Sequence, residues 1–117
     1  MKTHMDLDVW KLSMDFVETV YKLSSQFPSD EVYGLTSQIR RAAVSIPSNI
    51  AEGASRQSPK EFVQFLYISL GSLSEVETQL MLSQRLQFAV NVQSALNSAV
   101  TIKKMLNGLI THQKGKI

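Results

Sequence analysis

Basic side chains are the first residues of this sequence whose chemistry suggests a function. Two adjacent pairs, Arg40-Arg41 and Lys103-Lys104, lie in segments with helical periodicity. Clustered cations release counterions from a phosphate backbone, so these four residues are candidates for contact with nucleic acid. Solvation, or ion pairing within the protein, is the alternative role for each. No aromatic residues alternate with these bases, as stacking on single strands would favour. Further bases extend the set: Arg56, Lys60, Arg85, Lys114 and Lys116.

Residues for catalysis or metal binding are scarce. The chain has no cysteine, which excludes disulfides, thiolate nucleophiles and thiolate metal sites. The two histidines, His4 and His112, lie near opposite ends without carboxylates at metal-ligand spacing. The sequence contains neither of the two common glycine-rich motifs that bind phosphate, G-x-x-x-x-G-K-[ST] and G-x-G-x-x-G. We therefore expect no enzyme activity, no catalytic residue, no metal, no cofactor and no small-molecule substrate.

Glu77 is the one acidic residue in an unusual position. It falls inside the apolar stripe of its predicted helix, where a carboxylate needs a partner. Counting back across a loop near Gln57 places it level with Arg40 on an antiparallel helix. The sequence therefore predicts an ion pair between Arg40 and Glu77, with Lys103 as the alternative partner.

Helical periodicity dominates the chain and predicts the elements that position these residues. Asp8 is the expected N-cap of the first helix, and Ser58-Pro59-Lys60-Glu61 has the pattern of a helix start. Pro47 predicts a kink in the second helix, and Gly53 offers a left-handed position to end it. The four helices are expected at about residues 8–26, 33–53, 59–86 and 90–112.

Short connections between these segments predict an all-α fold, an antiparallel up-down-up-down four-helix bundle. A length of 117 residues fits a single domain over residues 1–117. The longest uncharged run, residues 86–102, is too polar to span a membrane, and no export signal is visible at the start. We expect a cytoplasmic protein with no membrane contact.

Apolar residues exceed what one core needs. The core stripe of the first helix leaves a second seam about 100–160° away around the helix axis. Its members are Trp10, Met14, Val17 and Tyr21. The helix at 90–112 is apolar over roughly 220°, about twice the usual arc. Such seams predict self-association, since exposed apolar patches mark association sites.

The segment at residues 39–53, IRRAAVSIPSNIAEG, resembles the hallmark of the four-helix-bundle proteins encoded in intervening sequences of bacterial 23S rRNA genes. Val9-Trp10-Lys11, the Ser58-Pro59-Lys60-Glu61 start with Phe62, and GSLSEVETQL at residues 71–80 are also similar. The resemblance implies a homopentamer. It also implies a relation to accessory proteins of diversity-generating retroelements, which present basic surface to nucleic acid and to a reverse transcriptase.

Two functional hypotheses follow. The first is a non-catalytic oligomeric module that binds RNA or a ribonucleoprotein through Arg40, Arg41, Lys103 and Lys104. The acid-free C-terminal third favours it, because residues 78–117 contain five basic and no acidic side chains. The alternative is a protein-protein interaction scaffold without nucleic-acid binding. Convergence of the four basic residues on one exposed surface would favour the first hypothesis.

Overall fold

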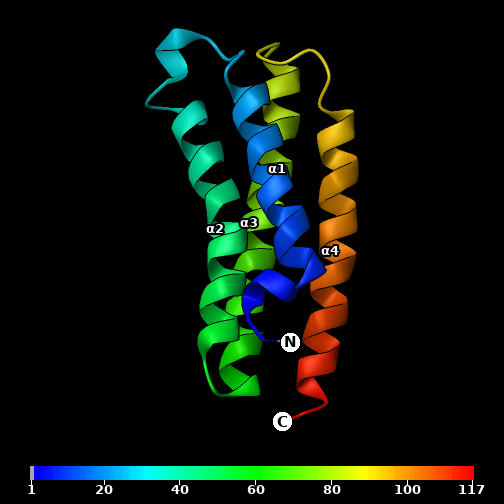
Figure 1. Cartoon of the computed structure of the whole chain (residues 1–117). Coiled ribbons are helices and arrows are strands. Elements are labelled where there is room, and N and C mark those ends of the chain that lie inside the picture. Colours follow the sequence, from blue (N-terminus) through cyan, green and yellow to red (C-terminus); the bar gives the residue numbers. More distant parts are fainter. Residues whose placement is uncertain (1) are drawn as a thin grey trace.

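Four long helices make up most of the protein, whose computed structural model describes residues 2–117 (Figure 1). Two short 3-10 helices, η1 (His4–Asp6) and η2 (Ser29–Glu31), precede the first two long helices. No strand occurs within residues 2–117. The expected all-helical fold with four helices is confirmed. The long helices are α1 (Asp8–Ser24), α2 (Leu35–Ser55), α3 (Pro59–Arg85) and α4 (Gln93–Lys114).

The chain reverses direction at each connection. In Figure 1 the sequence colours show that α1 and α3 run from the bottom of the view to the top, whereas α2 and α4 run from the top to the bottom. Each long helix packs against two others, so that α1 contacts α2 and α4, and α3 contacts the same two helices. The pairs α1/α3 and α2/α4 lie across the diagonals, and their backbones do not approach each other closely. A side chain on the outer side of α2 therefore faces a different surface from one on the outer side of α4.

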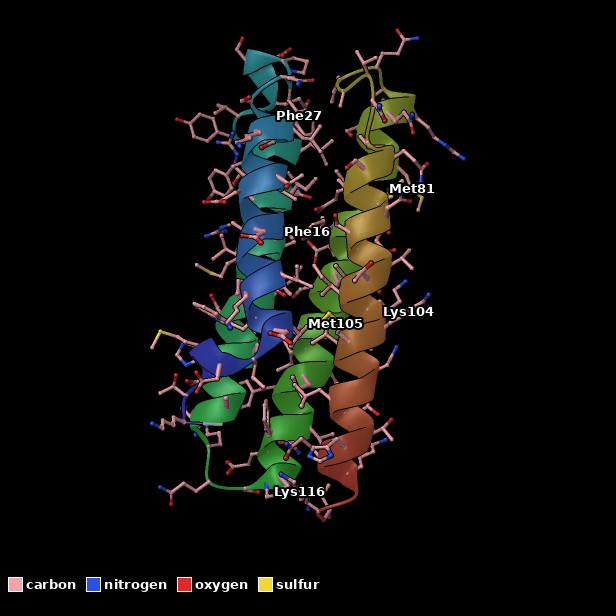
Figure 2. The ribbon with its side chains drawn as sticks, turned by 45° about the vertical axis from the view of Figure 1, so that its right-hand side comes forward. Phe16, Phe27, Met81, Lys104, Met105 and Lys116 are labelled. Carbon is pink, nitrogen blue, oxygen red and sulfur yellow. The ribbon has the colours of Figure 1, made fainter. Side chains whose placement is uncertain are left out.

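The core lies along the middle of the bundle and contains the predicted stripes. Phe16, Ile46, Leu73 and Leu106 are among its fully buried members. Figure 2 shows Phe16 and Met105 on the inner sides of α1 and α4. The apolar arc of α4 is mostly covered, since Leu96, Met105 and Leu109 pack against the core. The prediction of a surplus exposed apolar face on α4 is therefore corrected, because most of that face belongs to the core. The chief exception in the predicted stripe of α1 is Leu12, which is 39% exposed.

Side chains at the helix starts explain where the helices begin. Ser58 Oγ accepts a hydrogen bond from the Glu61 N–H (3.3 Å), and Pro59 is the first residue of α3, as predicted. Leu35 starts α2 two residues later than expected, with its N–H donating to Glu31 Oε1 (3.0 Å). The expected N-cap role of Asp8 is wrong, because Leu7 occupies that position without a side-chain cap.

Gly53 has a packing role instead of the expected helix-ending role. Helix α2 continues past it to Ser55, and no glycine within residues 2–117 has a positive φ. A Cβ at Gly53 would lie 2.7 Å from the Cβ of Phe65 on α3, closer than atoms can pack. The missing side chain thus allows α2 and α3 to approach each other. Pro47 lies within the continuous helix α2, and a kink there stays a prediction.

Candidate nucleic-acid and assembly surfaces

Arg40 is held against the last turn of α1 by uncharged groups. Its Nε donates to Ser24 Oγ (2.7 Å), and its Nη2 donates to the Tyr21 carbonyl (3.2 Å). Its guanidinium carbon lies 4.6 Å from the centre of the Tyr21 ring. A cation at this place is favoured, because carbonyl oxygens at a helix C-terminus carry partial negative charge. No carboxylate within residues 2–117 forms an ion pair with Arg40.

The predicted ion pair between Arg40 and Glu77 is wrong. Glu77 Oε1 instead lies 2.9 Å from Lys103 Nζ, which was the alternative partner. The side chain of Glu77 is 13% exposed and that of Lys103 is 41% exposed. Both α2 and α4 flank α3, but Glu77 points to the α4 side. The α2 side of α3 is marked by Ser72, whose hydroxyl hydrogen-bonds Ser45 on α2 (2.9 Å).

Arg40 and Arg41 line one hollow of about 600 Å³, here called the arginine groove. It contains no acidic side chain, and Arg41 is exposed on its wall. The other lining residues come from α1, the turn before α2, and α2 itself: Tyr21, Val32, Thr36, Ser37, Val44 and Ser45. The two arginines therefore share one hollow whose lining contains no carboxylate.

The two lysines of the predicted basic set lie elsewhere. Lys104 is exposed on the outer side of α4 (Figure 2), and Lys103 is paired with Glu77. Since α2 and α4 lie across a diagonal of the bundle, the arginine pair and Lys104 occupy separate surfaces of the protomer. Convergence of all four bases on one surface, the criterion set from the sequence, is not met within one copy.

Three of the four seam residues share a second hollow, here called the apolar groove. Trp10, Met14 and Val17 line it from α1, and its volume is about 410 Å³. The walls from α2 are Val44, Pro47, Ser48 and Ala51, and His4 and Glu18 complete the lining. Met14 is 44% exposed. The fourth seam residue, Tyr21, lies in the adjoining arginine groove and carries Arg40 on its ring.

A family model for the 23S rRNA-intervening sequence protein matches residues 5–108. The chain belongs to this family. The match includes the arginine groove, the Glu77–Lys103 pair and all of the apolar groove except His4. The fold is similar to the crystal structure of a protein of unknown function from the S23 ribosomal protein family of Bacteroides thetaiotaomicron, with a TM-score of 0.80. The two chains are 28% identical, and the similarity covers 88% of this chain and 95% of the other. No protein with a curated description matches.

Three bases in this family member lie over aromatic rings, which the spacing of the sequence did not indicate. Besides Arg40, the Arg56 guanidinium carbon is 5.1 Å from the Phe65 ring centre and Lys114 Nζ is 5.2 Å from that of Tyr67. No ring lies on the same element as its base, and Arg56 itself directly follows α2. Such contacts arise from helix packing, so a local sequence pattern could not show them.

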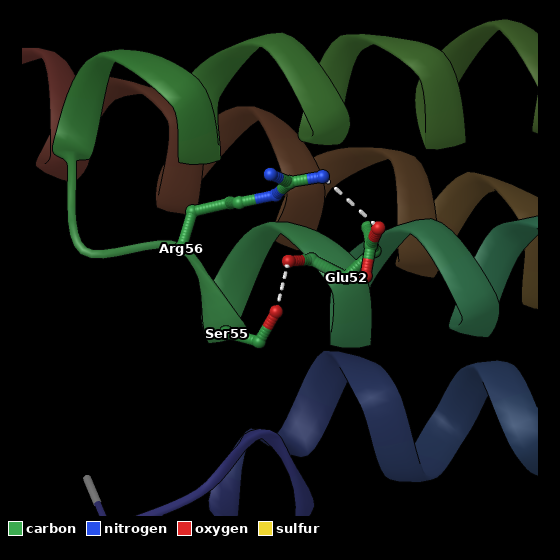
Figure 3. A network of polar contacts seen from close by, with 3 residues as sticks. All are labelled: Glu52, Ser55 and Arg56. Atoms are coloured by element: carbon green, nitrogen blue, oxygen red, sulfur yellow. Dashed lines mark hydrogen bonds and ion pairs between the residues drawn. The ribbon is translucent and has the colours of Figure 1, made fainter.

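Arg56 also has an acidic partner. Its Nη2 lies 3.1 Å from Glu52 Oε1, and Ser55 Oγ donates to the Glu52 carbonyl (2.7 Å), as Figure 3 shows. Arg56 is therefore neutralised locally, unlike Arg41 and Lys104. No group of three metal-binding side chains occurs within residues 2–117, and no helix there is long and apolar enough to cross a membrane.

Proposed function

We propose that this member of the 23S rRNA-intervening sequence protein family is a non-catalytic module that assembles with copies of itself through the apolar groove. The observation that carries this proposal is the shared lining of Trp10, Met14 and Val17 beside Val44 and Pro47. The groove is open at the surface of α1 and α2. Soluble proteins rarely leave contiguous apolar surface exposed to water, so such a surface generally marks a site of association.

The outer side of α3 supplies further exposed apolar side chains, in two pairs about 20 Å apart along the helix. Tyr67, Ile68, Met81 and Leu82 are each 44–50% exposed there. A cyclic assembly with head-to-tail contacts needs two unlike surfaces on each copy. We place the outer side of α3 from one copy on the apolar groove of the next, and the family resemblance leads us to propose five subunits.

Light scattering on the purified chain tests this assembly. We expect a mass several times 13.1 kDa, and Met14→Asp should reduce it to that of one copy because a carboxylate in the contact would be desolvated. Val90→Asp is the matched control, since Val90 is 90% exposed and lies outside both surfaces. A parent chain that is monomeric at micromolar concentration, or a Met14→Asp variant that keeps the full mass with normal helix content, contradicts the proposal.

RNA binding is a second candidate function, supported by the charge of α4 and by Arg41 on α2, which is exposed and forms no ion pair in the described part of the chain. This helix contains no acidic residue, and Lys104, Lys114 and Lys116 have no carboxylate partner within residues 2–117. The affinity for structured RNA and single strands should fall steeply as salt rises. Arg41→Glu should weaken binding to all sequences alike, since phosphate contacts carry no sequence information. Absence of binding at low salt would leave the interaction scaffold without nucleic-acid contact.

A further inference from the structure

The arginine groove contains side-chain donors that the protein itself does not use. A guanidinium carries five N–H groups, and Arg40 uses two of them, on Ser24 and Tyr21. Three donors of Arg40 remain. Arg41 makes no side-chain hydrogen bond or ion pair within residues 2–117, so all its donors remain. Both side chains line the same hollow.

Two hydroxyl groups in this groove are also free to donate. Thr36 and Ser37 make no side-chain hydrogen bond within the described residues, although both lie in the first turn of a helix. Ser37 precedes Arg40 and Arg41 by three and four residues, which places the three side chains on neighbouring positions of one helix face. The groove thus brings together two cations and two uncommitted hydroxyls.

A second hollow on the protein shows the opposite arrangement. The space of about 240 Å³ between α1 and α4 is lined by Asp15 and three hydroxyl residues. Those hydroxyls, on Thr19, Ser98 and Thr101, each donate to a carbonyl four residues earlier, at 3.2, 3.2 and 3.3 Å. Their remaining lone pairs and the carboxylate make that hollow rich in acceptors. Of these two hollows, the arginine groove is the one arranged to receive an anion.

The backbone at the start of α2 does not supply the binding groups. Glu31 Oε1 accepts from the Leu35 N–H, so a carboxylate of the chain already occupies this helix N-terminus. An anion in the groove would instead meet the flank of α2, where Ser37, Arg40 and Arg41 lie. The contacts of Arg40 with Ser24 and Tyr21 fix its guanidinium in advance, which reduces the entropy lost when a ligand binds.

We propose that the arginine groove binds a phosphate group. Guanidinium groups donate paired hydrogen bonds that match the spacing of phosphate oxygens, and hydroxyls add single donors. A hollow of about 600 Å³ exceeds one phosphate and leaves room for an attached nucleoside or neighbouring nucleotide. The group can come from a free phosphomonoester or from the backbone of a strand. The inference is independent of self-assembly through the apolar groove.

Calorimetric titration of the full chain at about 0.15 M ionic strength tests the site. The probes are inorganic phosphate, uridine monophosphate and a short oligouridine without terminal phosphate. Arg41→Gln should weaken binding of each bound probe by about tenfold or more, because charged hydrogen bonds are lost. Lys11→Gln is the matched control, with the same change in charge at an exposed residue near the opposite end of α1 from Tyr21. It should alter binding by no more than about twofold, since exposed charges on distant surfaces are screened.

Arg40→Lys is the second variant, because it keeps the charge but loses the paired donors. We expect it to weaken phosphate binding while helix content stays that of the parent. Binding of the monophosphate but not the oligouridine supports a free phosphomonoester as the source, and tighter binding of the oligouridine supports a strand. Failure of all three probes to bind, or equal weakening by Arg41→Gln and Lys11→Gln, overturns the proposal. Light scattering of the same samples reports assembly separately.

Discussion

Arg40 and Lys103 are two partly buried cations on opposite sides of the bundle, and they have different kinds of partners. Lys103, on the α3–α4 side, meets the carboxylate of Glu77. Arg40, on the α1–α2 side, meets a hydroxyl, a carbonyl and an aromatic ring. Both side chains are held in place, but only Lys103 is neutralised. A cation bonded to neutral groups is not neutralised, so its charge is still available to attract an anion. The partners of each base therefore say more about where an anion could bind than the number of bases does.

The contact between α2 and α3 joins these two sides of the bundle. A substitution of Gly53 at this contact has the largest expected effect on stability. Gly53→Ala places a Cβ 2.7 Å from Phe65 Cβ and 2.9 Å from a Phe62 ring carbon, which forces the two helices apart. We expect a loss of about 1–3 kcal/mol in the free energy of unfolding, as for other overpacked sites. Urea denaturation followed by circular dichroism measures it.

Gly71 on α3 is the matched control for this substitution. A Cβ there would meet no atom within 4 Å, so Gly71→Ala should stabilise the protein by up to about 1 kcal/mol through helix propensity. Equal effects of the two substitutions would show that α2 and α3 do not depend on a close approach at Gly53.

Salt dependence sharpens the comparison between the two cations. Glu77→Gln should lower the free energy of unfolding by about 1 kcal/mol, because the partly exposed pair with Lys103 loses its charge attraction. The loss should shrink between about 0.15 M and about 1 M salt, where the screening length falls from about 8 Å to about 3 Å.

Arg40→Gln provides the contrast, since its partners are neutral. Its destabilisation should change little over the same range of salt, because hydrogen bonds to Ser24 and Tyr21 do not depend on a second charge. Denaturant titrations of both variants at two salt concentrations measure the difference. The same salt response in both would mean that Arg40 is held by charge after all.

Glu77 shows how much of the site the sequence could predict. Periodicity placed it correctly toward the interior, and counting across the loop gave a level along the bundle. Counting does not say on which side of α3 the carboxylate lies. At about 100° per residue, Glu77 is about 140° around the helix from Ser72, which faces α2. That rotation directs it to α4 and to Lys103, so the first partner was wrong and the alternative was right.

The four helices were predictable because their apolar spacing is local. The surfaces between them were less so, because they depend on which helices are neighbours. Trp10, Met14 and Val17 share a groove as their spacing suggested, but its other wall comes from Val44 and Pro47 on α2. The partners of Arg40 come from α1, sixteen and nineteen residues away. Local patterns contain no information about contacts between separate helices.

The smallest expected effect concerns Asp6, at the entrance to the α1–α2 side. Its Oδ2 accepts from the Thr3 N–H (3.1 Å) and the Lys2 N–H (2.9 Å), and these bonds lower the pKa of the Asp6 carboxyl below its ordinary value. Since the pKa is lower in the folded state, the carboxylate stabilises η1 above the unfolded pKa of about 3.9. That stabilisation is lost as the pH falls through the lower folded pKa.

The fluorescence of Trp10 reports this change on one side of the bundle only, because Trp10 is the single tryptophan of the chain. Helix η1 holds the His4 ring 5.1 Å from the Trp10 ring, so acidification below about pH 4 should alter the fluorescence as η1 loosens. Asp6→Asn should remove this acid step, whereas the control Asp8→Asn should keep it. An acid step of the same size in Asp6→Asn would assign the change to other carboxylates. If Asp6 is responsible, the α1–α2 side loosens locally at its entrance before the α3–α4 side responds.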